Sequence, residues 1–308
     1  MQQHWFDTPT LGHEPPDEIE LTLEELEDDH PQGIVSKGAR ERFRSFEGPA
    51  PLRFPWQRNA PIWLSTGHAF GYLAPALPGK RLLPVRALGA IRPDLSLRQS
   101  RIIISLDRLC IKSYPGRGTH RVLVHFYAQN QLPDVAEDLH FNALYRVRQG
   151  EQAAIRGYPV FIGLCVGASG IRLRCRTINI GNEQDEAFLH WLESDTFKCG
   201  LKLAQAASPL VGPFSEMAFG IAKTIADRHR NISVQDIDLG LDFSTIPTGA
   251  RLAEGAYVAV QIPERLQPTW DWDDWAFQPS SGQIVQRSDP STGLPYNFII
   301  FSIRRYQE

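Results

Sequence analysis

The stretch that decides the fold is Pro159-Val-Phe-Ile-Gly-Leu-Cys-Val166, a turn at Ala168-Ser-Gly170, and then Ile171-Arg-Leu-Arg-Cys-Arg-Thr-Ile-Asn-Ile180. In the second segment two kinds of side chain alternate, with Ile171, Leu173, Cys175 and Thr177 on one side and Arg172, Arg174 and Arg176 on the other. A period of two is typical of a strand with one dry face and one basic face. The Ser-Gly turn between the segments predicts that they form a hairpin.

Further strand-like runs lie on both sides of this unit, and they cover residues 101–106, 121–127, 233–242, 256–262 and 296–303. Between them, residues 183–230 favour helices, with Pro213 placed for a first turn and a helix end near Asn231. Strands and helices do not alternate regularly, which disfavours a doubly wound parallel sheet. We therefore predict an α+β fold, mainly β: an antiparallel β-sandwich or open barrel with this helical insertion, and the C-terminal strand paired inside a sheet.

Charge is segregated along the 308 residues. Residues 1–34 carry ten acidic side chains and no Lys or Arg, whereas residues 35–125 carry sixteen basic and four acidic ones. The segment 35–79 is also rich in proline and aromatic residues. We predict an acidic flexible arm at 1–34, a basic extended segment at 35–79 and a single β-rich domain at 80–308. Such asymmetry is informative about partners and solubility, not about the fold.

Two sets of residues are candidates for binding a partner. The arm contains Leu21, Leu23 and Leu26, which could form a short apolar stripe that folds against a partner's groove. The basic segment contains arginines with interleaved aromatic residues, namely Arg40, Arg42, Arg44, Arg53 and Arg58. Arginines in this setting suit phosphates and other anions. Another protein is the expected partner, and nucleic acid or anionic lipid is the alternative.

The N-terminus has neither a basic start nor an apolar core of a signal peptide, and no stretch approaches the about 20 apolar residues of a membrane-spanning helix. We expect a cytoplasmic protein. Its four cysteines, Cys110, Cys165, Cys175 and Cys199, form no C-x-x-C pair. Cys165 and Cys175 are expected to be buried reduced thiols, although a disulfide between them would be possible if their strands paired face to face.

Two side-chain sets could support chemistry. Asp271, Asp273 and Asp274 in Trp270-Asp-Trp-Asp-Asp-Trp275 could join Asp236, Asp238 or Asp242 to hold calcium, which prefers such oxygen ligands. His120, His125 and His140 could pair with Cys110 as a nucleophile site. No nucleophile elbow, H-E-x-x-H or EF-hand spacing is present, so no catalytic residue is assigned and no cofactor other than calcium is considered.

The resulting hypothesis is a non-enzymatic interaction protein, in which the acidic arm masks a basic surface or docks on a partner. Opposite charge blocks in one chain attract, and salt weakens that attraction. The alternatives are a metal-dependent or Cys/His hydrolase, and a peripheral membrane or pore-forming effector that acts through the helical region 199–230.

Overall fold

A computed structural model describes Phe6 and residues 8–28, 61–75, 80–116, 118–132, 135–153, 155, 157–181, 189, 192, 200–203, 211–246 and 249–307. Two sheets form the body of this part of the chain, and a third, smaller sheet lies on the larger of them.

The larger sheet has seven strands, in the spatial order β3 (Arg86–Ala87), β1 (Gly67–Leu73), β11 (Gly255–Ile262), β14 (Phe298–Arg305), β4 (Arg101–Cys110), β7 (Tyr158–Cys165) and β9 (Leu201–Lys202). All neighbours in it are antiparallel except β7 and β9. The C-terminal strand β14 lies between β11 and β4, which confirms that it pairs inside a sheet.

The second sheet has four antiparallel strands, in the order β10 (Asn231–Asp242), β8 (Gly170–Ile180), β5 (Thr119–Gln131) and β6 (Ala136–Arg148). The small sheet consists of β13 (Gln283–Gln286), β12 (Trp275–Gln278) and β2 (Leu83–Pro84). The helices whose full bounds lie in the described ranges are two α-helices, α1 (Pro16–Asp28) and α5 (Val211–Ala226), and a set of short 3-10 helices. These 3-10 helices are Leu11–His13, Ile62–Leu64, Leu88–Ala90, Leu95–Leu97, Glu264–Thr269 and Trp272–Asp274.

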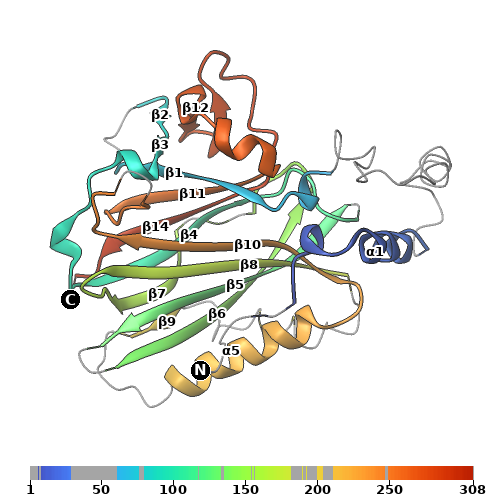
Figure 1. The fold of residues 1–308 in the computed structure, drawn as a ribbon, viewed down its shortest axis with the longest axis horizontal. Coiled ribbons are helices and arrows are strands. Elements are labelled where there is room, and N and C mark those ends of the chain that lie inside the picture. The colour runs from blue at the N-terminus through green and yellow to red at the C-terminus, as the bar shows by residue number, and fades with distance from the viewer. Residues whose placement is uncertain are drawn as a thin grey trace.

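The layers follow from which face of each strand is apolar. The inner faces of the two large sheets enclose the main core, with Phe126 and Phe141 from one sheet and Tyr257 and Phe301 from the other. The outer face of the four-stranded sheet is covered by α5, and the outer face of the seven-stranded sheet is covered by the small sheet. Figure 1 shows α5 along β6 and the small sheet at the opposite side of the body.

The predicted fold class is confirmed: the protein is mainly β, with a sandwich of open sheets and few helices. The predicted α-helix with Pro213 in its first turn is also present as α5, but it ends at Ala226 and Asn231 begins β10. The alternation of β8 holds as well, because Ile171, Leu173 and Cys175 belong to the inner core and the arginines lie on the other face.

The predicted hairpin is wrong. Strand β7 pairs with β4 and β9 in one sheet, and β8 pairs with β10 and β5 in the other. The short connection therefore crosses between the sheets, closed by a hydrogen bond from Gly167 N to Gly170 O of 3.0 Å. A short turn with glycine can connect two strands of one hairpin or two strands of different sheets. Here each strand buries its inner face between the sheets, which favours the connection from one sheet to the other. Cys165 and Cys175 are both free, and of the two only Cys175 is fully buried.

The division of the chain at residues 34 and 79 stays a prediction, but the structure places parts of both segments in the body. Phe6 and Leu11 are each only 6% exposed, and Leu11 belongs to the main core. Strand β1 is an internal strand of the seven-stranded sheet. A detachable arm therefore cannot include residues 6–11 without exposing apolar surface.

Among the helices that the structure describes, none has the length and apolar character needed to cross a bilayer.

A pair of leucine substitutions tests whether residues 6–11 belong to the body. Leu11→Ala should lower the free energy of unfolding by about 2–4 kcal/mol, because it leaves a cavity in the core. Leu21→Ala, at a leucine that is 56% exposed, should change it by less than about 0.5 kcal/mol. Urea unfolding followed by tryptophan fluorescence measures both. Equal effects of the two substitutions would contradict the packing of Leu11 in the main core.

Candidate functional site

The outer face of the four-stranded sheet carries a ladder of charges. Arg176 pairs with Asp236 at 2.5 Å, Arg174 lies 3.4 Å from Asp238, and Arg172 reaches Asp238 at 2.6 Å. The two aspartates stand opposite Arg176 and Arg174 in the register of β10 and β8. The Arg172 pair is exposed and contributes at most about 1 kcal/mol. The guanidinium of Arg176 is buried, so removal of Asp236 would be far more costly.

The N-terminal segment lies across this ladder. The Phe6 ring stacks on the guanidinium of Arg176, with 4.6 Å from its Cζ to the ring centroid, and on Phe219 of α5 at 5.6 Å between centroids. Arg176 Nη1 also donates to the carbonyl of Thr8 at 2.9 Å. The dense polar groups of this face are thus already occupied by the protein's own residues.

A buried polar network holds α5 against the same face. Asn142 Nδ2 donates to the carbonyl of Ala218 at 2.7 Å, and the N–H of His140 donates to Ser215 Oγ at 2.7 Å. His125 Nδ1 lies 2.6 Å from Asn142 Oδ1, which can only accept, so this nitrogen carries the proton. The neutral Nε2 of His125 then accepts from His140 Nδ1 at 3.1 Å. The helix therefore depends on a neutral imidazole.

Burial keeps His125 uncharged. It lowers the pKa of His125 well below its ordinary value, with the neighbouring His140 and Arg176 acting in the same direction and the Asn142 hydrogen bond opposing them. Burial also lowers the pKa of His68 to about 4, although Asp236 raises it, and lowers the pKa of His120. These histidines are structural groups whose protonation opposes folding.

The aspartates proposed for calcium do not converge with Asp236 and Asp238, which lie on the other sheet and pair with arginines. Asp271 accepts from the N–H of Asp273 at 2.8 Å, at the start of a 3-10 helix, and the Asp273 side chain is 89% exposed. No group of three His, Cys, Asp or Glu side chains in the described ranges is arranged to hold a metal ion.

The predicted Cys/His pair is not assembled. Cys110 is buried on the outer face of the seven-stranded sheet, in the cluster beneath the small sheet. His125 and His140 lie on the outer face of the other sheet, beside Phe219. Two layers of strands therefore separate the thiol from these imidazoles. Burial also raises the pKa of Cys110 to about 11, which disfavours the reactive thiolate.

The candidate partner-binding residues are only partly described. Leu23 packs against the main core from α1, whereas Leu21 points outward. Two residues apart on an α-helix means roughly 200° of rotation, so these leucines cannot share one stripe. The side chain of Leu26 lies outside the described residues, as do Arg40, Arg42, Arg44, Arg53 and Arg58.

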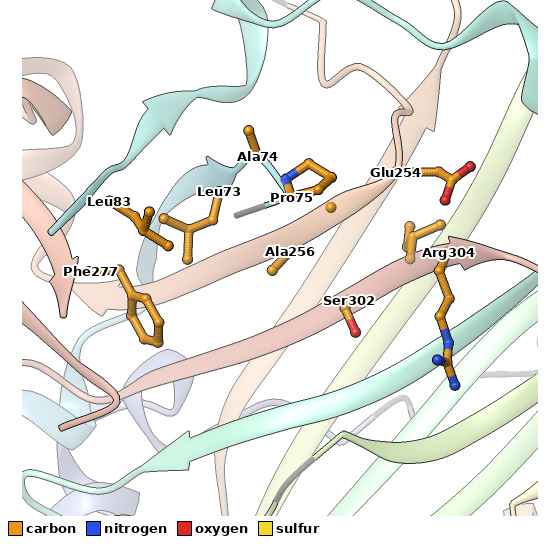
Figure 2. Close-up of a pocket in the computed structure, with 11 residues that line it drawn as sticks. Leu73, Ala74, Pro75, Leu83, Glu254, Ala256, Phe277, Ser302 and Arg304 are labelled. Carbon is orange, nitrogen blue, oxygen red and sulfur yellow. The ribbon is translucent and has the colours of Figure 1, made fainter. Parts of the chain in front are cut away.

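Of two pockets lined by described residues, the larger has a volume of about 340 Å³ and lies on the outer face of the seven-stranded sheet. It opens where β1 ends, next to β2 and β12 of the small sheet. Figure 2 shows that Leu73, Leu83 and Phe277 gather at one end of it and that Ala256 forms part of its floor. Its volume lies at the lower limit of small-molecule sites, about 300–1,000 Å³.

The other end of the pocket is polar. Figure 2 places Ser302, Arg304 and Glu254 there, with the charged groups of Arg304 and Glu254 pointing away from each other. Glu254 is engaged by its neighbour: its Oε2 accepts from the N–H of Arg305 at 3.2 Å, and its Oε1 lies 3.7 Å from Arg305 Nε. The Ser302 hydroxyl donates to Asp107 at 3.2 Å. The pocket is therefore amphipathic.

The lining of the pocket contains few ionisable groups. The described residues that line the pocket include no histidine or cysteine, and its one carboxylate is paired. Sequence reasoning missed all of these residues. The pocket is formed by residues of β1, β2, β11, β12 and β14 and of the segments next to them. No local sequence pattern indicates that the ends of these strands lie together.

Comparisons of the chain with models of protein families, with curated proteins and with solved structures gave no match.

The His125 network predicts a sensitivity to acid. A group whose pKa is lowered in the folded state contributes stability above its unfolded value of about 6.5, and this is lost as the pH falls. The melting temperature should therefore drop between pH 7.5 and pH 5, and His125→Gln should flatten that dependence even though it lowers stability at pH 7.5. Differential scanning calorimetry across this range measures the slope. His229→Gln, at an exposed histidine, is the matched control, and the flattening produced by His125→Gln should exceed its effect.

Proposed function

We propose that this protein is a non-enzymatic binding protein whose pocket at the end of β1 receives an apolar group of its ligand. The observation that supports this most directly is the open pocket itself, with Leu73, Leu83 and Phe277 around one end. Apolar side chains exposed to a cavity of this size favour the burial of a ligand group, at roughly 25 cal/mol per Å² removed from water.

The charged face of the four-stranded sheet is a weaker candidate for the same role. Its arginines have carboxylate partners, and Phe6 already covers Arg176. A ligand there would have to replace these contacts before it gained any of its own. The pocket requires no such replacement, which favours it on energetic grounds.

The charge asymmetry of the chain suggests a second binding surface, separate from the pocket. The basic segment around Arg40–Arg58 and the acidic residues of α1 remain candidates for contact with another protein or an anionic partner. Since Leu11 belongs to the core, masking by an arm is best tested with charge changes on α1 rather than with a deletion of residues 1–34.

Filling the pocket tests the proposed function. The neutral dye N-phenyl-1-naphthylamine gains fluorescence in apolar surroundings, and it should bind the wild-type protein. Ala256→Phe places an aromatic ring in the cavity, so it should weaken binding by about tenfold or more, equivalent to about 1.4 kcal/mol. Fluorescence titration gives the affinities.

Two further variants make the result interpretable. Ala136→Phe adds the same ring at an exposed position on β6 of the other sheet, and it should leave dye binding unchanged. Leu83→Gln makes the apolar end polar without filling it, and it should also weaken binding. The proposal fails if folded Ala256→Phe and Leu83→Gln proteins bind the dye as the wild type does.

A further inference from the structure

The rim of the pocket differs in charge from its floor. Residues 80–93 contain Lys80, Arg81, Arg86 and Arg92 and no acidic residue. Lys80 and Arg81 are exposed, and Arg81 is two residues from Leu83, a distance of at most about 7 Å along the chain. Arg86 stands opposite Tyr72 of the inner core and so faces the other side of the sheet. Cationic side chains therefore lie on the small-sheet side of the pocket mouth.

Arg304 adds a cation at the opposite, polar end. Within the described residues, no carboxylate lies within the 4.0 Å ion-pair limit of its guanidinium. The nearby Glu254 is instead held by Arg305 through its backbone N–H and its side chain. Arg304 thus keeps its five donors available for an anion.

Asp107 is a second carboxylate near this end, and it attracts Arg304. It lies beneath Ser302, and burial raises its pKa, while the Ser302 hydrogen bond, Arg108 and Arg304 oppose that shift. Lys80, Arg81 and Arg304 outnumber the two carboxylates near the pocket, Glu254 and Asp107, and Glu254 is already paired with Arg305.

We propose that the ligand of the pocket is a soluble anionic amphiphile: a carboxylate at the Ser302–Arg304 end, joined to an alkyl or aryl chain that lies among Leu73, Leu83 and Phe277. This rests on the binding function proposed above and names the class of its ligand. Charge-assisted hydrogen bonds from a guanidinium to a carboxylate supply the preference for the head group, and burial of the chain supplies the remaining affinity. The volume of the cavity limits the chain to a short one.

Displacement of N-phenyl-1-naphthylamine by three eight-carbon compounds tests the class of ligand. Octanoate, 1-octanol and octylammonium share the chain and differ in charge, so differences among them report on the head group. We expect octanoate to displace the dye at about tenfold lower concentration than 1-octanol, and octylammonium to be the weakest. Equal displacement by octanoate and 1-octanol would overturn the proposal while leaving the proposed binding function intact.

Substitutions then locate the head group. Arg304→Gln should weaken octanoate by about tenfold and leave 1-octanol unchanged, and Arg304→Lys should restore part of the difference. Arg148→Gln, at an exposed arginine at the end of β6, is the matched control and should change neither. If octanoate binding is the same in the Arg304→Gln protein, the carboxylate does not lie where we place it and the assignment is wrong.

A final experiment distinguishes binding of a free amphiphile from binding to a lipid surface. The protein is sedimented with phosphatidylglycerol vesicles in the presence and absence of octanoate. We expect it to stay in the supernatant, because the pocket accommodates one short chain. If the protein sediments with the vesicles and octanoate does not displace the dye, the proposal is overturned in favour of membrane contact. Failure of the wild-type protein to bind the dye at all would remove the binding function and this inference together.

Discussion

The structure depends on the packing of the two large sheets against each other through their inner faces. Tyr257 and Phe301 stack at 5.5 Å within the seven-stranded sheet, and Phe126 and Phe141 belong to the same core from the opposite sheet. Because side chains alternate along every strand, this one interface fixes which residues must face outward. The charged ladder on one outer face and the pocket on the other are both consequences of it.

The two outer faces meet water in different ways. On the four-stranded sheet part of the outward positions is charged, and cross-strand ion pairs and Phe6 satisfy this part. The apolar outward positions, such as Leu123 and Ile178, are covered by α5. On the seven-stranded sheet the outward positions are apolar, and the small sheet covers them. Trp272 fixes this cover, because it is buried and donates from Nε1 to the carbonyl of Phe70 at 2.8 Å. The tryptophans of 270–275 thus have a structural role.

The pocket lies where this second cover stops. The small sheet protects the middle of the seven-stranded sheet, whereas β1 ends at Leu73 and exposes the neighbouring ends of β11 and β14. The open space is therefore bounded by apolar residues from the cover and by the polar termini of two strands. A pocket with one apolar end and one polar end follows from that geometry, without any dedicated loop or motif.

Local periodicity in the sequence was enough to determine the mainly β class, the alternating strand β8, the helix that begins near Pro213 and the existence of a C-terminal strand, because each depends on neighbours in the chain. The pairing of β7 and β8 with different sheets, the burial of Phe6 and Leu11, and the separation of Cys110 from His125 depended on contacts between distant segments. The pocket belongs to this second group. Its walls come from strands separated by up to about 230 residues, and only the packing of sheet on sheet brings them together.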